Sequence, residues 1–215
     1  MHFEVLTFNP FQENTYIVWD DAGQAAIIDP GCSNAEERAE LDVCIRANGL
    51  TPVLLLNTHC HIDHVLGNGH VERTYGLELW MHRAELPVHS AVPEYAHMWG
   101  MEANDIGTPA RFIQEGEVIK VGGLRFEALF TPGHSPGSLT FYERGTGHAF
   151  VGDVLFQGSI GRTDLPGGDM KTLMTSIMNR LIPLPDSVKV HPGHGPSTTI
   201  GEEKRTNPFI LHYGR

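Results

Sequence analysis

The sequence Leu54-Leu-Leu-Asn-Thr-His59-Cys-His61-Ile-Asp63-His64 is an apolar run, typical of a buried strand, that leads into four potential metal ligands. Side chains alternate along an extended chain, so His59 and His61 are expected to point to the same side. A helical turn beginning near Asp63 would aim Asp63 and His64 back towards the same pocket. Because one cation cannot use all four side chains comfortably, the pattern predicts two cations about 3.5 to 4 Å apart.

Three further candidate ligands follow strand-like segments later in the chain, where glycine and proline fix the direction of the backbone. His134 lies in Thr-Pro-Gly-His-Ser-Pro-Gly, and His194 lies in His-Pro-Gly-His-Gly-Pro. Asp153 carries two carboxylate oxygens and is the natural bridge between two cations. Taken singly, each has an ordinary alternative as a loop histidine bonded to backbone or a turn aspartate, but the joint pattern favours a metal site.

Two neighbours of the candidate ligands are given other roles. Cys60 lies between His59 and His61 and by alternation faces the other way, so we expect it to act as a small buried hydrophobic residue. Asp29 ends an earlier strand-like segment. It is either a turn aspartate or a hydrogen-bonding partner of a ligand, and the predicted metal set leaves it out.

Two stretches, residues 15–29 and 138–153, share one pattern of apolar strand, glycine-containing polar turn, second apolar strand and terminal aspartate. A helical pattern follows each of them, and another apolar strand comes next, at residues 52–56 and 187–190. The chain thus uses a strand, strand, helix, strand unit twice. Such units predict an α/β (α+β) fold of two mixed sheets packed face to face with outer helices, whose strand ends bring the ligands to one edge.

Helix signals support this reading. Asn34 and Glu37 have capping-box spacing, and Gly49 suits a C-terminal stop. Asp169 is the candidate N-cap of the second helix. Its apolar residues recur at helical spacing: Met170, Leu173, Met174, Ile177, Met178 and Leu181. Residues 83–107 contain helical stretches without a clean apolar stripe, so this segment is either an insertion beside the site or ordinary covering structure.

Composition narrows the class of protein. A chain of 215 residues with 40% hydrophobic composition predicts one domain over residues 1–215, with an internal duplication of roughly 1–110 and 111–215. A formal charge of −11 without a Lys/Arg cluster argues against nucleic acid as a partner. No segment approaches the about 20 apolar residues of a membrane span.

Cysteine and histidine usage add to this picture. The three cysteines lack the spacing of a disulfide framework, which favours a reducing compartment, and we expect a cytoplasmic protein without a membrane partner. The 13 histidines indicate metal or acid–base chemistry. The oligomeric state cannot be inferred from the sequence.

The segment Thr58-His-Cys-His-Ile-Asp-His resembles the signature of the metallo-β-lactamase superfamily. Four later segments are similar to its glyoxalase II branch: Thr131-Pro-Gly-His-Ser-Pro-Gly-Ser, Gly152-Asp-Val-Leu-Phe, Gly161-Arg-Thr-Asp and Pro192-Gly-His-Gly-Pro. The resemblance covers nearly the whole chain and implies the four-layer αββα sandwich of that superfamily. It also implies that His59, His61 and His134 hold one cation. Asp63, His64 and His194 would hold a second, with Asp153 as the bridge.

The same resemblance separates branches of the superfamily. Branches that reduce oxygen at a di-iron site usually carry a carboxylate at the position of His61, and zinc β-lactamases typically lack the aspartate at the position of Asp153. The sequence resembles glyoxalase II without its C-terminal helical region, which supplies basic glutathione contacts, so recognition of glutathione stays open. His191 stands where relatives often have an aromatic residue. Arg162 is either a contact for a substrate carboxylate or part of a structural ion pair.

The predicted function is hydrolysis of a small acyl thioester or ester. Two cations lower the pKa of a shared water towards about 7 and polarise the acyl carbonyl. Asp63 is expected to accept a proton as the tetrahedral intermediate collapses. Zinc is the expected ion, with iron or manganese as alternatives.

Two other functions remain open at this point. Mononuclear iron persulfide dioxygenases share the fold but generally lack the Pro-Gly-His-Gly turn that ends the ligand set here at His194. A non-catalytic protein whose cations only hold the two halves together is the other alternative. Structural zinc sites are usually rich in cysteine, whereas this set contains none.

Overall fold

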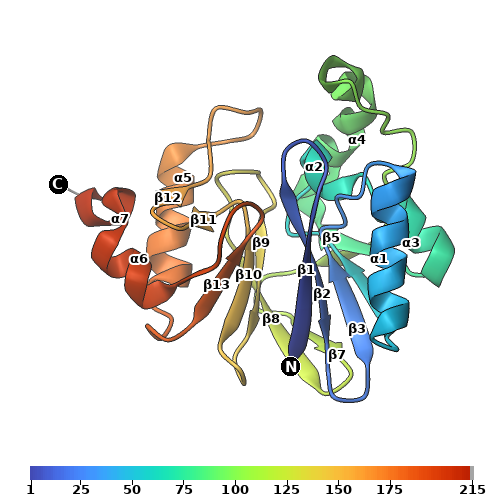
Figure 1. Cartoon of the computed structure of the whole chain (residues 1–215). Coiled ribbons are helices and arrows are strands. Elements are labelled where there is room, and N and C mark those ends of the chain that lie inside the picture. Colours follow the sequence, from blue (N-terminus) through green and yellow to red (C-terminus); the bar gives the residue numbers. More distant parts are fainter. Residues whose placement is uncertain (214–215) are drawn as a thin grey trace.

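Two six-stranded mixed sheets packed face to face form the centre of the molecule, and helices cover both outer faces (Figure 1). The structure is a computed structural model and describes residues 1–213. The layered arrangement confirms the αββα sandwich expected from the sequence.

The first sheet has the strand order β1-β2-β3-β4-β5-β6, which is also the order in the sequence. The pairs β1-β2 and β2-β3 are antiparallel, whereas the pairs from β3 to β6 are parallel. The strands are β1 (His2–Phe8), β2 (Glu13–Trp19), β3 (Gln24–Ile28), β4 (Thr51–Leu56), β5 (Leu79–His82) and β6 (Pro109–Ile113).

The second sheet has the order β14-β13-β10-β9-β8-β7. Only β10 and β13 are parallel within it. The strands are β7 (Val118–Val121), β8 (Leu124–Phe130), β9 (Leu139–Glu143), β10 (His148–Gly152), β13 (Lys189–Pro192) and β14 (Thr198–Thr199). A separate small hairpin consists of β11 (Leu155–Phe156) and β12 (Ser159–Ile160).

Both sheets contain the strand, strand, helix, strand unit that the sequence indicates. In the first, β2 and β3 form an antiparallel pair, α1 (Ala35–Ala47) follows, and β4 returns parallel to β3. In the second, β9 and β10 pair, α5 (Met170–Ser176) follows, and β13 returns parallel to β10. The parallel return places the carboxyl ends of β4 and β13 beside those of β3 and β10. An origin of these units by duplication stays a prediction.

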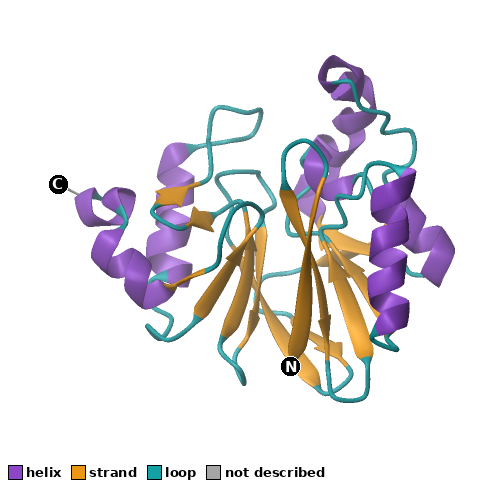
Figure 2. Ribbon diagram, viewed as in Figure 1, coloured by secondary structure: helices purple, strands orange, loops and turns teal. Residues whose placement is uncertain are grey.

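The helices divide between the two outer faces and one edge (Figure 2). Helices α1 and α3 (Asn68–Tyr75) cover the first sheet, while α5, α6 (Ile200–Thr206) and α7 (Pro208–His212) cover the second. Helices α2 (Ile62–Val65) and α4 (Leu86–Tyr95) lie near the edge where the strands of both sheets end. Short turns of 3-10 helix flank α4 at Arg83–Glu85 and Ala96–Trp99.

The predicted helix caps are present. The side chain of Asn34 accepts a hydrogen bond from the backbone N–H of Glu37, and that of Asp169 accepts one from Thr172. The second helix departs from the expected regular pattern, because residues Ile177–Leu181 form a π-helical turn after α5. Ile177 and Leu181, at the two ends of this wider turn, are both fully buried.

Alternation along β4 explains how the core is built. Leu54 and Leu56 point between the sheets, where Phe126, Phe141 and other aromatic residues fill the space. Leu55 points the other way, towards the layer that contains Leu41 of α1. A strand buried on both faces therefore needs the continuous apolar run seen in the sequence.

Some elements differ from expectation. The strand predicted at residues 187–190 begins at Lys189 and continues to Pro192, so His191 belongs to it. Strand β1 was not predicted at all, because its exposed residues interrupt the apolar pattern. Residues 83–107 pack over α2 through a cluster that includes Met81, Val92 and Ile106. Among residues 1–213, no helix has the length and apolar character to cross a bilayer.

Candidate metal centre

The candidate ligands meet at the edge where the strands of both sheets end. His59 follows β4, and His61 is the residue just before α2, which carries Asp63 and His64. His134 lies in the loop between β8 and β9, while Asp153 and His194 follow β10 and β13. The structure thus brings together residues as far apart in the sequence as His59 and His194, and each comes from the turn in which the sequence placed it.

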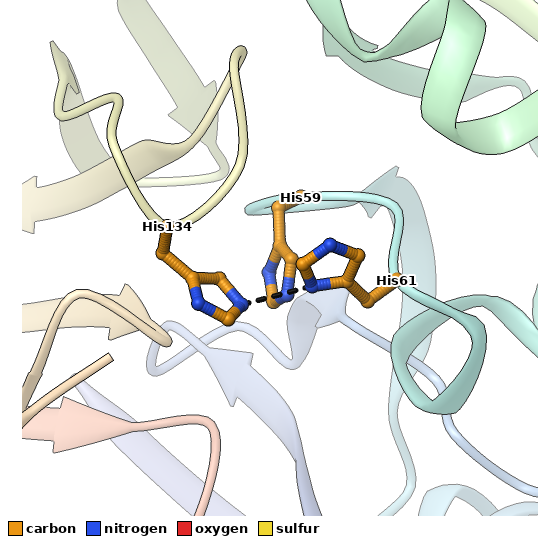
Figure 3. Close-up of side chains that lie close together, drawn as sticks. All are labelled: His59, His61 and His134. Carbon is orange, nitrogen blue, oxygen red and sulfur yellow. Dashed lines mark hydrogen bonds between the residues drawn. The ribbon is translucent and has the colours of Figure 1, made fainter. Parts of the chain in front are cut away.

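His59, His61 and His134 form the first cluster (Figure 3). One ring nitrogen from each lies within 4.8 Å of the others. The closest pair is Nδ1 of His61 and Nε2 of His134, which are 2.9 Å apart. Three imidazole nitrogens that converge from two sheets in this way form a donor set typical of a divalent transition metal.

Asp63, His64 and His194 form the second cluster, with ligand atoms again within 4.8 Å of one another. Nε2 of His194 lies 3.0 Å from Oδ2 of Asp63, and Nε2 of His64 lies 3.6 Å from the same oxygen. His64 is fully buried, whereas the side chain of His194 is 27% exposed. Solvent therefore reaches the second cluster from the side of His194.

Asp153 lies between the two clusters. Its Oδ2 atom is 3.5 Å from Nε2 of His134 in the first cluster and 3.4 Å from Nε2 of His194 in the second. Its Oδ1 atom is 3.6 Å from Nε2 of His64. One carboxylate therefore contacts both donor sets, which is the geometry that a bridging ligand requires.

Unpartnered buried atoms show that the residues fit cations. Nε2 of His59, Nε2 of His64 and Oδ1 of Asp153 are buried, and each lacks a hydrogen-bond partner among the described residues. Buried polar atoms are normally hydrogen-bonded, since leaving them unpaired costs about 1 to 3 kcal/mol each. His59 belongs to the first cluster, His64 to the second, and Asp153 contacts both, so cations held by the two clusters would satisfy these atoms.

The opposite ring nitrogens are fixed by hydrogen bonds, which decides which nitrogen faces the site. In four of the histidines, Nδ1 has a partner outside the clusters. The partners are Thr58 Oγ1 for His59 at 3.1 Å, Asp29 Oδ2 for His64 at 3.2 Å, the Arg162 carbonyl for His134 at 2.8 Å and the Phe11 carbonyl for His194 at 3.1 Å. In each of these four histidines, Nε2 is therefore the nitrogen that faces the clusters.

Asp29 orients ligands, which supports the second of the two roles considered for it. Its Oδ1 atom accepts hydrogen bonds from Thr58 N at 2.7 Å and Asn57 Nδ2 at 3.2 Å. Its Oδ2 atom accepts from Thr58 Oγ1 and His64 Nδ1. Although Asp29 lies within reach of His59 and His64, these four donors occupy its oxygens. The residue adopts a φ of 50°, a conformation that non-glycine residues seldom take without such support.

The histidines of the first cluster are in the protonation state that a cation requires. Burial lowers the pKa of His59, His61 and His134, and it lowers that of His61 to about 3. These rings are therefore neutral at physiological pH, as metal ligation requires. Burial opposes ionisation of Asp153, but the neighbouring His64 and His194 outweigh it and hold the pKa of that carboxyl well below its usual range.

The second cluster is charged in the absence of a cation. Burial alone would lower the pKa of His194, yet hydrogen bonds to Asp153 and Asp63 raise it to about 9. The pKa of His64 is likewise raised, because the nearby carboxylates outweigh burial. Burial also opposes ionisation of Asp63, but His64 and His194 lower its pKa overall. A cation in this cluster would take the place of protons held between these groups.

Close packing around residue 193 explains why a glycine precedes His194. A Cβ atom at this position would overlap Oδ1 of Asp153 and would lie 2.6 Å from Cε1 of His64. The backbone of this turn therefore approaches the bridging carboxylate more closely than any other residue type would allow.

We expect Gly193→Ala to displace Asp153 and to lower the free energy of unfolding by about 1 to 3 kcal/mol, as overpacking does. Urea denaturation and metal content of the purified variant measure the two effects. Gly123→Ala is the matched control, because its Cβ would be 3.6 Å from its nearest neighbour and its backbone φ is not positive. Unchanged metal content in Gly193→Ala would contradict this account of the turn.

Two residues left open by the sequence lie outside the clusters. The guanidinium of Arg162 forms a paired contact with the carboxylate of Asp164, at 2.7 Å for both hydrogen bonds, so it belongs to an exposed ion pair. His191 packs between the sheets, with its ring stacked on Phe150 at 4.9 Å. It replaces the aromatic residue of relatives with another planar ring. Cys60 faces away from the clusters, as expected, and packs against Met81.

Sequence reasoning missed two buried carboxylates beside the site. Glu85 is fully buried and accepts hydrogen bonds from both ligand-bearing loops. Glu13 is also fully buried, and its Oε1 atom lies 3.9 Å from Nδ1 of His64. Burial raises the pKa of Glu13. Neither residue stands in a recognisable sequence pattern, so the sequence gives no signal for either of them.

The comparisons with known proteins agree with this geometry. Residues 8–194 match the model of the metallo-beta-lactamase superfamily. The chain is 43% identical over 212 residues to the hydroxyacylglutathione hydrolase GloC of Haemophilus influenzae, and the alignment covers 98% of each chain.

Two solved structures are similar over almost their whole length. The B3 metallo-beta-lactamase BLEG-1 has a TM-score of 0.89 and 36% identity, and the match covers 97% of this chain and 99% of that one. TTHA1623, solved in a di-iron-bound form, has a TM-score of 0.86 and 40% identity, with 96% and 99% coverage. Fold, site geometry and sequence similarity agree, and the chain belongs to the metallo-beta-lactamase superfamily.

Proposed function

We propose that this protein is a metal-dependent hydrolase of acyl thioesters that holds two divalent cations. His59, His61 and His134 would bind one, and the other ligands are Asp63, His64 and His194, with Asp153 shared. The observation that carries the proposal is the set of unpartnered buried atoms, one of which belongs to Asp153, the carboxylate that contacts both clusters. Zinc suits this mixed set of imidazole and carboxylate ligands, with iron and manganese as alternatives.

Bound cations would supply a hydroxide nucleophile near neutral pH and would polarise the acyl carbonyl. The protein's own residues keep the donor atoms in place. Asp29, itself held by Thr58 and Asn57, fixes the ring of His64, and the Arg162 carbonyl fixes that of His134. Preorganised groups of this kind lower a reaction barrier because they need not rearrange as charge develops.

Asp63 is the candidate proton acceptor. Its carboxylate lies next to His194 at the more exposed side of the site, and its lowered pKa keeps it ionised at neutral pH. We propose that it accepts a proton when the tetrahedral intermediate collapses and the thiolate departs. A thiolate leaves readily from a thioester and is itself a good ligand for zinc, which favours this substrate class over an amide.

The name of the Haemophilus influenzae relative supports a glutathione thioester as substrate. That protein is named a hydroxyacylglutathione hydrolase, and this chain is 43% identical to it over 98% of its length. Among acyl thioesters, a glutathione thioester is therefore the substrate to test first.

A mononuclear iron persulfide dioxygenase remains the alternative function. It would use only the first cluster, and it would leave unexplained why Asp63, His64 and His194 converge with an unpartnered Nε2 on His64. The second cluster therefore favours the dinuclear hydrolase.

The deciding experiment combines elemental analysis of the purified protein with three activity assays. These follow hydrolysis of S-lactoylglutathione, oxygen uptake with glutathione persulfide and opening of a chromogenic cephalosporin. Close to two metals per chain with thioester turnover would support the proposal. One iron per chain with oxygen uptake would refute it in favour of the dioxygenase. Cephalosporin opening without thioester turnover would assign the site to antibiotic hydrolysis instead.

A further inference from the structure

Glu85 is a fully buried carboxylate at the end of the short turn after β5. Three groups donate hydrogen bonds to it. The backbone N–H of Cys60 lies 2.8 Å from Oε2, the hydroxyl of Ser135 lies 2.6 Å from Oε1, and the backbone N–H of Gly137 lies 2.5 Å from Oε1. Burial raises the pKa of Glu85, while these hydrogen bonds act in the opposite direction.

The three donors belong to the two loops that carry the first cluster. Cys60 stands between His59 and His61, so its N–H is part of the backbone that places both rings. Ser135 directly follows His134, and Gly137 lies in the same loop. The carboxylate therefore joins a loop of the first sheet to a loop of the second, and it does so at the residues next to the candidate ligands.

Packing around Glu85 leaves little freedom in this connection. A Cβ atom on Gly137 would lie 2.8 Å from the backbone nitrogen and from Cγ of Glu85. The glycine thus allows the loop to approach the carboxylate closely enough for the N–H to bond. Ser135 reaches both carboxylate oxygens, at 2.6 and 2.8 Å.

We propose that Glu85 is a positioning residue that sets the separation between His134 and the pair His59 and His61, and thereby the affinity of the first cluster for its cation. The inference rests on the proposed metal-binding role of these three histidines. Metal–ligand distances tolerate errors of only about 0.2 Å, so the relative placement of two loops from different sheets matters directly. Groups that support ligands in this way typically change metal affinity by about 10- to 100-fold when they are replaced.

Glu85→Gln tests the connection with little change of shape. Each carboxylate oxygen accepts from one backbone N–H, Oε2 from Cys60 and Oε1 from Gly137. An amide has only one acceptor oxygen, so its NH2 group must face one of these N–H donors. One of the two loops therefore loses its backbone hydrogen bond to this side chain whichever way the amide turns, while Ser135, which reaches both oxygens, keeps a hydrogen bond to it.

Glu203→Gln is the matched control. Glu203 is also fully buried and also accepts from three donors, the hydroxyl of Thr198 at 2.6 Å, the N–H of Gly158 at 2.9 Å and the side-chain amide of Asn207 at 2.8 Å. These groups do not belong to the loops of the first cluster. A general loss of stability should therefore affect both variants, whereas a loss of metal affinity should affect only Glu85→Gln.

The experiment titrates zinc into metal-free full-length protein in competition with a chromogenic chelator, and records thermal unfolding of the same samples. We expect one of two zinc affinities to weaken about 10- to 100-fold in Glu85→Gln and to stay within twofold of wild type in Glu203→Gln. Zinc affinities within twofold of wild type in Glu85→Gln, with only a lower melting temperature, would reduce Glu85 to a structural role and overturn the inference.

Wild-type protein that takes up no cation would overturn the proposed function together with this inference, whereas an unchanged Glu85→Gln overturns the inference alone. If Glu85→Gln fails to fold, Glu85→Asp replaces it, because this variant keeps the buried charge but is one methylene too short to reach both loops. The same limits on the change in zinc affinity, within twofold or at least tenfold, then apply to Glu85→Asp.

Discussion

Asp153→Ala is expected to lower kcat/KM for thioester hydrolysis by at least about 10³-fold, equivalent to about 4 kcal/mol of transition-state stabilisation. The reason is that the carboxylate of Asp153 contacts both clusters, with His134 on one side and His194 on the other. Without the negative charge of this carboxylate between them, the two cations would repel each other more strongly. We therefore also expect metal content to fall from about two per chain to one or fewer.

Steady-state kinetics and elemental analysis of the same preparation measure this effect. Asp186→Ala is a suitable control, since that carboxylate is exposed and pairs with Lys204 away from the clusters. Full metal occupancy with full activity in Asp153→Ala would show that the carboxylate is not a bridge, and would leave the dinuclear site without its central element.

Removal of the cations is expected to have the second large effect. Dialysis against a chelator should abolish thioester turnover, and it should lower the melting temperature, because a cation that binds only the folded state stabilises it. At a free concentration about 1,000 times its Kd, one cation contributes about 4 kcal/mol. The effect is expected to be large here because the ligands come from loops of both sheets and a cation links them.

Differential scanning calorimetry before and after chelation, followed by addition of zinc, iron or manganese, measures the stabilisation and identifies the ion. Activity should return only with an ion that also restores the melting temperature. Turnover that persists in fully metal-free protein would contradict the proposed mechanism.

The local part of the site was predictable because the chain itself fixes it. His59, His61, Asp63 and His64 lie within one strand end and one helical turn, and backbone periodicity alone decides which way they point. The two repeated units, with Asn34 and Asp169 as caps, likewise follow from local signals, so the layers of the fold could be predicted.

The remaining features depend on contacts between distant segments. Glu85 lies beside the site because α4 packs over it. No pattern in the sequence around Glu85 connects this residue with Ser135. Asp29 was recognised only as a candidate partner, because its hold on His64 needs a positive φ that no sequence rule assigns to an aspartate. The π-helical turn after α5 has no signal in the sequence, because its buried residues Ile177 and Leu181 stand at ordinary helical spacing.

The hairpin of β1 and β2 also has a consequence for folding. Its residues bind the turn of His194 from the other end of the chain, since Tyr16 and Asn14 donate to the carbonyl of Pro192 and His194 bonds to the Phe11 carbonyl. These contacts span 176 to 183 residues. Contacts between residues so far apart in the sequence form slowly during folding. A growing polypeptide would therefore complete the second cluster only after His194 had been synthesised and its turn had docked on this hairpin, so that metal bound at both clusters would mark chains whose two sheets had met.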